Sequence, residues 1–165
     1  MNKKGHVLNA VLLSIGLGYL LEPATELEAV PATLEMMVMI GVPVTLGAMV
    51  PDIDTAFGKH RKTLHNLPLL VAFIAFPYAF GNLEYVWIGV LTHYVLDVAG
   101  SKRGIALFYP LSPREYSLPF GVAVSSSHAT IVTVLVTIVE VALVAVVVFE
   151  MPQQGLELGQ QAVGI

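Results

Sequence analysis

Titratable side chains gather in the segment 49–66, MVPDIDTAFGKHRKTLHN, although the chain on both sides of it is apolar. Pro51 ends or redirects any helix before it, and Asp52 and Asp54 follow at a spacing of two. In an extended segment, residues at this spacing point the same way, so both carboxylates can face one site. Carboxylate oxygen binds zinc and harder divalent ions alike. A cap on the next turn is the alternative role for either aspartate.

Two histidines in the same segment, His60 and His65, are five residues apart. This spacing suits a loop that leads into a helix better than one helical face. Neutral imidazole is the commonest metal-binding side chain, and nearby carboxylates can orient its second nitrogen. The basic residues between them act as topogenic charges. Arg61 has a second role open to it, because guanidinium matches phosphate oxygens in bidentate fashion.

A third motif, THYVLD at 92–97, places His93 and Asp97 four residues apart. On a helix these residues stand on one face, one turn apart, close enough to share a metal ion. An imidazole hydrogen-bonded to a carboxylate as a satisfied polar pair is the alternative. Inside a membrane helix the balance moves toward a functional site, because ionisable groups are costly there.

The composition predicts a membrane protein. Of 165 residues, 56% are hydrophobic and 12% are charged, against roughly 25% charged residues in soluble domains. The mean hydropathy is +0.77. The chain has no cysteine, which excludes disulfides and thiolate metal sites. Any metal must therefore be held by His, Asp, Glu or the backbone.

Five apolar segments predict an all-α integral membrane bundle of about five transmembrane or partly spanning helices. A span takes about 20 helical residues, so the last segment is comfortably long while the first and third are short. We expect one domain over residues 1–150 and a disordered tail over 151–165, which is polar and contains glycine. The five segments are 7–21, 34–50, 67–80, 83–99 and 129–149.

Charge is sorted between alternate loops. One set of loops holds every basic residue, and the other set holds glutamates and no Lys or Arg. The positive-inside rule then predicts a cell-membrane protein with a cytoplasmic N terminus and the C terminus outside. A soluble helical bundle has no reason to sort its charges in this way. The basic residues are Lys3, Lys4, Lys59, Arg61, Lys62, Lys102, Arg103 and Arg114.

This topology brings the titratable groups of the motifs to the cytoplasmic end of the bundle. All five histidines fall on that side, including His6 at the start of the first segment and His128 at the start of the last. The segment 100–121, GSKRGIALFYPLSPREYSLPFG, lies there too. We interpret it as an interfacial lid or re-entrant segment beside the site, with a plain amphipathic surface loop as an equal alternative.

The ordered set of motifs resembles the YdjM-like family of membrane-bound metal-dependent hydrolases. The match spans roughly Gly5 to Pro113. Many relatives have Thr and Ser where this chain has Leu64 and Asn66. The motifs are Gly5-His6, Pro51 to Asp54, His60 to His65, Gly89 to Asp97 and Tyr109-Pro110-Leu111.

That family is distantly similar to the superfamily of zinc-dependent phospholipases C and single-strand nucleases. Those proteins are all-helical, hold zinc through clustered His and Asp side chains, and cleave phosphodiesters. The resemblance therefore implies a divalent metal, most often zinc, in one or more copies. It implies as ligand candidates His6, Asp52, Asp54, His60, His65, His93 and Asp97.

We predict from these observations a multi-pass membrane hydrolase that acts on a phosphoester, such as a phospholipid headgroup, at the cytoplasmic face. Asp52, in the constrained position after Pro51, is the expected metal ligand, and Asp54 is the expected general base or bridging ligand. Arg103 or Arg114 would neutralise developing phosphoryl charge. Membrane lipids are the expected partners, and no nucleic acid is predicted.

Two other functions fit the same residues. One is a non-enzymatic, metal-stabilised membrane scaffold or regulator that recruits a cytosolic partner through its basic loops. The other is a metal-ion transporter, for which Glu140, deep in the last apolar segment, is thin support because the remaining ionisable groups cluster at one end. A serine hydrolase is disfavoured, since the serine run 125–127 lacks a G-x-S-x-G elbow.

Overall fold

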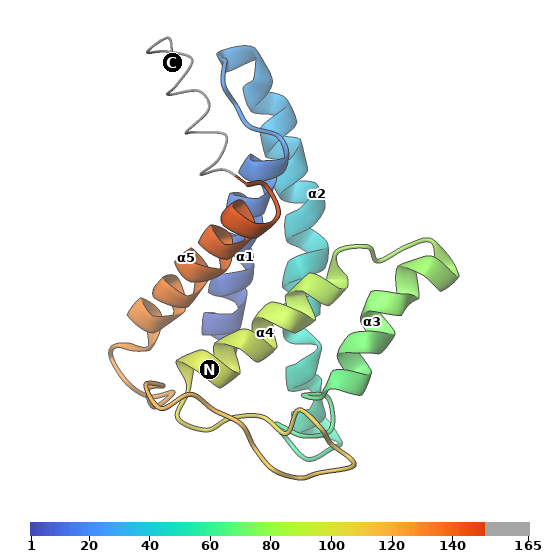
Figure 1. Cartoon of the computed structure of the whole chain (residues 1–165), viewed down its shortest axis with the longest axis vertical. Coiled ribbons are helices and arrows are strands. Elements are labelled where there is room, and N and C mark those ends of the chain that lie inside the picture. Colours follow the sequence, from blue (N-terminus) through green and yellow to red (C-terminus); the bar gives the residue numbers. More distant parts are fainter. Residues whose placement is uncertain (151–165) are drawn as a thin grey trace.

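Each long apolar segment of the chain forms a helix, because a backbone in hydrocarbon must satisfy its own hydrogen bonds. In a computed structural model, which describes residues 1–150, the helices pack as one bundle (Figure 1). The prediction of an all-α bundle with five helices is confirmed, and no strand occurs in the described part. The predicted disordered tail lies outside the described residues. The helices are α1 (Lys3–Leu21), α2 (Val30–Met49), α3 (Leu67–Phe80), α4 (Val86–Gly100) and α5 (Ala129–Val147), with short 3-10 helices η1 (Leu27–Ala29) and η2 (Pro51–Ala56).

Within residues 1–150, three helical stretches are long and apolar enough to cross a membrane: Lys3–Leu21, Leu27–Ala56 and Ala129–Val147. The other two helices are shorter, with 14 residues in α3 and 15 in α4. At 1.5 Å per residue each of them is about 22 Å long, against about 30 Å of hydrocarbon. We therefore describe α3 and α4 as partly spanning helices. The third segment is short as expected, whereas the first, also expected to be short, forms the 19-residue α1, because the helix begins before the apolar run, at Lys3.

Local signals fix where the helices that carry site residues begin. The Asn2 side chain accepts a hydrogen bond from Gly5 N at 2.8 Å, so α1 starts just before His6. Asn66 caps α3 in the same way, accepting from Leu69 N at 3.0 Å. His65 therefore stands immediately outside α3, in the loop that leads into it.

Helices α2 and α4 approach each other closely because each carries a glycine at the crossing. A Cβ on Gly47 would lie 2.0 Å from the Val86 carbonyl oxygen, and one on Gly89 would lie 2.0 Å from the Val44 carbonyl oxygen. Small residues allow this backbone-to-backbone packing in membrane bundles. One turn beyond Gly89, the close approach brings His93 against the end of α2.

A polar layer ties α1, α4 and α5 together inside the bundle. The Asn9 amide nitrogen donates to Thr137 Oγ1 and Glu140 Oε2, both at 2.8 Å. Thr92 Oγ1 lies 2.5 Å from Asn9 Oδ1 and 2.7 Å from Glu140 Oε1. Thr92 has one hydroxyl hydrogen for these two oxygens. Both contacts are hydrogen bonds only if Glu140 carries a proton and donates it to Thr92.

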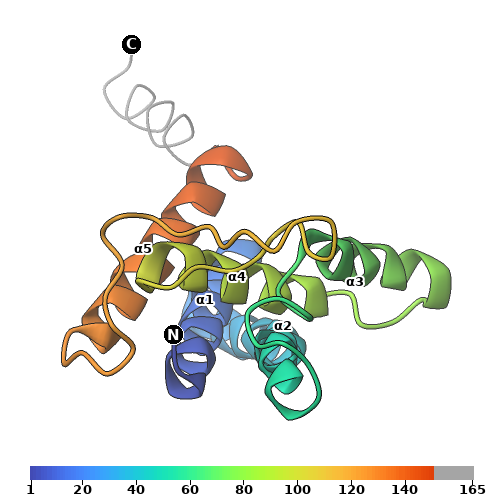
Figure 2. The ribbon, with the colours of Figure 1, turned by 90° about the horizontal axis from the view of Figure 1, so that it is seen from below.

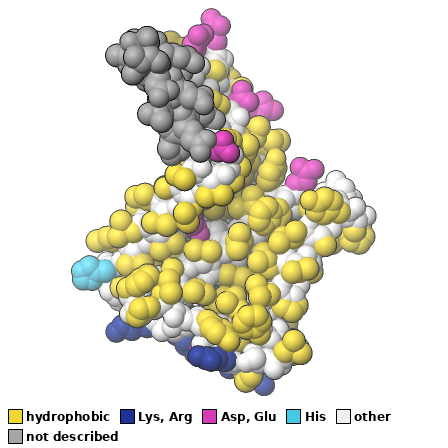
Figure 3. Space-filling model, in the orientation of Figure 1, with side chains coloured by type: hydrophobic (Ala, Val, Ile, Leu, Met, Phe, Trp, Pro, Cys, Tyr) yellow, Lys and Arg dark blue, Asp and Glu magenta, His cyan; other side chains and the backbone are white. Residues whose placement is uncertain are grey.

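Charged side chains lie at the two ends of the bundle. In Figure 3, Lys and Arg occupy the lower end of this face, Asp and Glu lie mainly toward the upper end, and hydrophobic side chains cover most of the surface between them. The lower end is where α1 begins. The loop before α3 and the loop before α5, which carry the other basic residues, lie there too. An apolar belt between two polar ends is the surface expected of a protein that sits in a bilayer.

The charge distribution predicts that the basic end faces the cytoplasm. Single cysteines placed at Ala56, beside the basic loop, and at Ala29, at the opposite end, should label from opposite sides of the membrane. We expect a membrane-impermeant maleimide to label position 29 in intact cells and position 56 only after permeabilisation. Labelling of position 56 alone in intact cells would invert the topology.

The hydrogen count around Glu140 predicts that Glu140→Gln leaves stability close to that of the parent protein. The glutamine amide donates to Thr92 and accepts from Asn9, as a protonated carboxyl does. Glu140→Leu removes one hydrogen bond from each of these two buried partners and should cost about 1–3 kcal/mol. Unfolding in detergent measures both variants. A glutamine variant as unstable as the leucine variant would mean that the carboxylate is ionised.

Candidate metal centre

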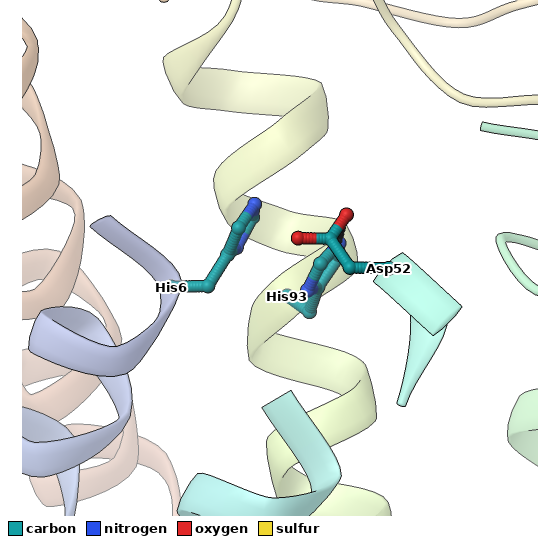
Figure 4. Close-up of side chains that lie close together, drawn as sticks. All are labelled: His6, Asp52 and His93. Atoms are coloured by element: carbon teal, nitrogen blue, oxygen red, sulfur yellow. Dashed lines mark ion pairs between the residues drawn. The ribbon is translucent and has the colours of Figure 1, made fainter. Parts of the chain in front are cut away.

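The seven side chains named as ligand candidates converge on one end of the bundle. His6 comes from α1, His93 and Asp97 from α4, Asp52 and Asp54 from η2, and His60 and His65 from the loop before α3. Figure 4 shows His6, Asp52 and His93 side by side, each reaching in from a different element. Three overlapping groups have donor atoms within 4.8 Å of one another: His6, Asp52 and His93; Asp52, His60 and His65; and His65, His93 and Asp97.

Three donor atoms form a small triangle in the cluster. His65 Nε2 lies 3.1 Å from His93 Nε2, and Asp97 Oδ2 lies 3.7 Å from each of these nitrogens. The centre of a triangle with these sides is about 2.0 Å from each corner, which is the length of a zinc bond to nitrogen or oxygen. All three side chains are buried. The triangle therefore has the dimensions of three ligands on one small divalent ion.

The hydrogen-bond partners of the two imidazoles decide which lone pairs face the triangle. Asp54 Oδ2 lies 3.0 Å from His65 Nδ1, and the Ala48 carbonyl oxygen lies 2.7 Å from His93 Nδ1. Because both oxygens accept, we assign the hydrogen of each neutral imidazole to Nδ1. Burial lowers the pKa of His65, against the opposing charges of Asp54 and Asp97, which favours the neutral ring. The two Nε2 lone pairs then point into one 3.1 Å gap, where a cation would join them.

His6 has no hydrogen-bond partner for either ring nitrogen within residues 1–150, although its side chain is almost fully buried. Its ring stacks on His93 with centroids 3.6 Å apart and an interplanar angle of 7°. Its Nε2 lies 3.4 Å from Asp97 Oδ1, an ion-pair distance without hydrogen-bond geometry. Leaving buried polar atoms unpaired costs free energy, so this imidazole points to a ligand that binds it.

Asp52 adds an oxygen beside the triangle. Its Oδ1 lies 3.9 Å from His93 Nε2 and 4.0 Å from His65 Nε2, and its carboxylate accepts no hydrogen bond from residues 1–150. It belongs both to the donor group with His6 and to the donor group with His60. A carboxylate in this position can bind one ion or bridge two.

Asp54 occupies a different position, behind the histidines. Its Oδ1 lies 3.0 Å from His60 Nδ1, while its Oδ2 faces His65 Nδ1 at 3.0 Å and accepts from Leu64 N at 3.3 Å. A carboxylate bonded to the remote nitrogen of a ligand histidine fixes the ring and increases its basicity. The role of Asp54 as general base or bridging ligand stays a prediction. Its contacts in the fully buried interior are those of a residue that orients two imidazoles.

The carboxylate of Asp97 has cationic neighbours. The amino group of Met1 contacts Oδ1, and Arg61 Nη2 lies 4.0 Å from the same oxygen. The Arg61 guanidinium is buried, and its Nη1 donates to Ser101 Oγ at 3.1 Å and to the Arg103 carbonyl oxygen. Arg61 thus joins the loop after α4 to the cluster. Its Nη1 is occupied by these hydrogen bonds within the protein.

The two arginines expected at the phosphoryl group contact other residues. Arg103 pairs with Glu115 through Nε at 3.1 Å and Nη2 at 3.2 Å. This hydrogen-bonded ion pair raises the pKa of Arg103 and lowers the pKa of Glu115. The Arg114 guanidinium lies over the ring of Tyr116, 5.3 Å from its centroid. The proposed phosphoryl role of these two residues stays a prediction.

Sequence reasoning missed Tyr94, which supports the loop that carries His65. The Tyr94 hydroxyl donates to the Leu64 carbonyl oxygen at 2.7 Å and accepts from Asn66 N at 3.1 Å. Asn66 itself serves as the cap of α3, and Leu64 contributes its backbone groups. Leu64 and Asn66 are therefore compatible with a well-held His65. The position of Tyr94 directly after His93 was the available signal.

The segment after α4 lies at the same end as the cluster and runs along α4 on the side away from α1 and α2 (Figure 2). Backbone bonds attach it to neighbouring elements: Ala106 N donates to the Arg61 carbonyl at 2.9 Å, and Leu118 N donates to the Val98 carbonyl at 2.8 Å. Ile105 and Ala106 are buried. The segment is an irregular loop packed on the bundle, and His128 at its far end is exposed, contacting Ser126.

Comparison with known proteins identifies a family. A family model described as YdjM inner membrane protein matches residues 1–155, which include every motif of the cluster. The family resemblance drawn from the motifs is thereby confirmed. No curated protein and no solved structure matched the chain.

The donor triangle predicts that His93→Ala and Asp97→Ala each lose bound metal. Removal of one ligand leaves two, whereas the loss of one hydrogen bond typically costs only about 1 kcal/mol of stability. Metal per chain should be measured by mass spectrometry after zinc loading and desalting of protein in detergent. His128→Ala, an exposed histidine outside the donor groups, is the matched control. Parental metal content in both folded variants would reject the triangle as a metal site.

Proposed function

The chain belongs to the YdjM inner membrane protein family, and from that premise we propose that its buried His and Asp cluster binds one or more divalent metal ions and hydrolyses a phosphoester at the membrane surface. Zinc is the ion we favour, because imidazole nitrogen and carboxylate oxygen are both zinc ligands. The observation that carries the proposal is the arrangement of the ring nitrogens: the Nε2 atoms of His65 and His93 face each other at 3.1 Å, and neither nitrogen of His6 has a hydrogen-bond partner within residues 1–150.

Four side chains would hold the first ion. His65, His93 and Asp97 supply the donor triangle, and Asp52 supplies a further oxygen. His6 extends the donor set on the other side of His93 and, with Asp52, could serve a second ion. When bound, a divalent ion of this kind lowers the pKa of a coordinated water toward about 7 and polarises a phosphoryl oxygen.

We assign proton transfer to His60. Asp54 Oδ1 accepts from His60 Nδ1, which leaves His60 Nε2 with a free lone pair. The His60 side chain is 39% exposed, whereas the other three imidazoles of the cluster are buried. Nε2 can therefore take a proton from an attacking water and pass it to solvent. Asp54 would then assist through the imidazoles that it orients, which refines its expected role as the base.

A phospholipid headgroup is the substrate that we propose, because the cluster lies at the end of an apolar bundle, where headgroups lie. Lys3 lines the same cavity as His6 and Asp52 and offers an ammonium group to a phosphate. We further propose that this end faces the cytoplasm, as the positive-inside rule predicts from the basic loops. A protein that retains metal but turns over no phosphoester would instead be a metal-stabilised scaffold.

The proposal predicts metal-dependent hydrolysis by the purified protein. Zinc-loaded and chelator-treated samples should be screened against phospholipids in mixed micelles and against a soluble model, bis(p-nitrophenyl) phosphate. We expect phosphate-ester cleavage in the loaded sample and its recovery when zinc is returned to the stripped one. Full metal occupancy without cleavage of any of these substrates would reject the hydrolase.

The two aspartates and His60 should separate by role. Asp52→Asn should lose metal and activity together. In Asp54→Asn the amide can accept from only one of the two imidazoles, so metal affinity should fall about 10–100-fold. His60→Asn should keep its metal and lose most of its turnover. Titration with zinc, paired with the hydrolysis assay, measures both properties. Parental turnover in the His60 variant would refute its assignment to proton transfer.

A further inference from the structure

Two cavities adjoin along the line where α1 and α2 pack. One, of about 430 Å³, is lined by His6 and Asp52 of the cluster, by Lys3, and by apolar residues that include Leu46. The other, of about 470 Å³, is lined almost wholly by apolar side chains of both helices, and Leu46 lines it as well. Because they share this residue, we treat the two cavities as one feature, the α1–α2 groove.

The groove exists because small residues form its floor. Ser14 of α1 and Gly41 of α2 face each other there, and a Cβ on Gly41 would lie 3.5 Å from Ser14 Cβ. Larger side chains rise on both sides, among them Ile15, Val38 and Val42, which are 46–64% exposed. No residue of the loop after α4 lines either cavity. The groove therefore opens directly toward the membrane.

We propose that the α1–α2 groove receives one hydrocarbon chain of a membrane phospholipid whose phosphate lies at Lys3, beside His6 and Asp52. The inference rests on the proposed function for the headgroup and adds the site that binds the chain. Its first support is continuity: one groove begins at donor atoms of the cluster and ends among aliphatic side chains. Its second is charge, because an anionic phosphate is matched by Lys3 at the polar end.

The length of the groove matches one leaflet. Along α1, nine residues separate His6 from Ile15, which at 1.5 Å per residue is about 14 Å. Half of a hydrocarbon core of about 30 Å is about 15 Å, the depth that a lipid chain occupies. A phospholipid can thus slide between α1 and α2 from the bilayer and present its phosphate to the cluster. Its chain never enters water, where each exposed methylene would cost free energy.

Photo-crosslinking tests the groove without requiring turnover. The full chain, loaded with zinc, is placed in phosphatidylcholine nanodiscs with a phosphatidylglycerol analogue that carries a diazirine near the end of one chain. We expect labelling at Val38 and Val42 to exceed that at Leu135 and Val139 of α5 by about fivefold or more. The α5 residues are a matched control, since all four are 56–64% exposed. Equal labelling of the two surfaces would overturn the proposal.

A second probe tests the contribution of the phosphate. A diacylglycerol with the same diazirine lacks the group that Lys3 would bind, so its labelling of the groove should fall to the level of α5. If this probe labels the groove as strongly as the phospholipid does, the phosphate does not direct the chain and the proposed binding mode is wrong.

A variant that fills the groove distinguishes an effect on lipid binding from an effect on the metal centre. Gly41→Phe should reduce crosslinking in the groove and cleavage of the two-chain lipid by about tenfold, a typical penalty when a pocket loses room. It should leave the metal content and the cleavage of bis(p-nitrophenyl) phosphate unchanged. Ala142→Phe, an exposed position on α5, is the matched control. An equal loss on both substrates would place the effect at the metal centre and reject the chain site.

The two proposals can fail separately. If no phosphoester is cleaved but the groove is labelled selectively with the phospholipid probe, the hydrolase fails and the lipid site stands. If the soluble phosphodiester is cleaved while labelling is the same on the groove and on α5, the hydrolase stands and the lipid site fails.

Discussion

Three carboxylates are buried at one end of an apolar bundle, and the contacts around them follow from the need to compensate their charge. Asp52, Asp54 and Asp97 are each no more than 8% exposed, and an ionised carboxylate in such surroundings must be paired or hydrogen-bonded. Asp54 meets this need through two imidazoles and a backbone amide, and Asp97 through cationic neighbours. Asp52 has no comparable partner within residues 1–150, and this is one ground for our proposal that the cluster binds a cation.

The bundle contains two polar layers that differ in this respect. In the deeper one, around Asn9 and Glu140, each polar contact becomes a hydrogen bond once the carboxyl is protonated, so the layer is complete by itself. In the other, the nitrogens of His6 are unpaired and two imidazole lone pairs share one gap. The layers are one turn apart on α1 and adjacent on α4. A network in which every polar atom is hydrogen-bonded stabilises helix packing. A binding site instead requires polar atoms that are free to bind a ligand.

The layer that contains His6 is covered by the protein on one side and adjoins the α1–α2 groove on the other. The loop after α4 covers the side of α4 away from α1 and α2, and Arg61 anchors that loop to the cluster (Figure 2). The groove between α1 and α2 reaches His6 and Asp52 on the other side, and we have proposed that it opens to the hydrocarbon. A site arranged in this way would take its substrate from the bilayer and exchange protons and water at the polar end, where His60 is partly exposed.

The helices, and the end of the bundle that carries the His and Asp cluster, could be predicted from the sequence. Runs of apolar residues can satisfy their backbone in a membrane only as helices, and the placement of Lys and Arg sorts the loops between two ends. Spacing alone put His93 and Asp97 on one helical face, because that relation is local. Even the short third segment predicted a helix too short to span fully.

Which metal-binding atoms meet, and which residues support them, could be learned only from the folded chain. At a spacing of two, Asp52 and Asp54 would face one site in an extended segment, but Pro51–Ala56 forms the 3-10 helix η2, in which residues two apart point in different directions. The division of the pair into an open oxygen and a carboxylate behind two imidazoles depends on how η2 folds against the loop before α3. The Ala48 carbonyl that orients His93 follows from the glycine crossing of α2 and α4, and the groove follows from Gly41 facing Ser14 across two helices. Such contacts join residues far apart in the chain, and the spacing of residues within one segment carries no information about them.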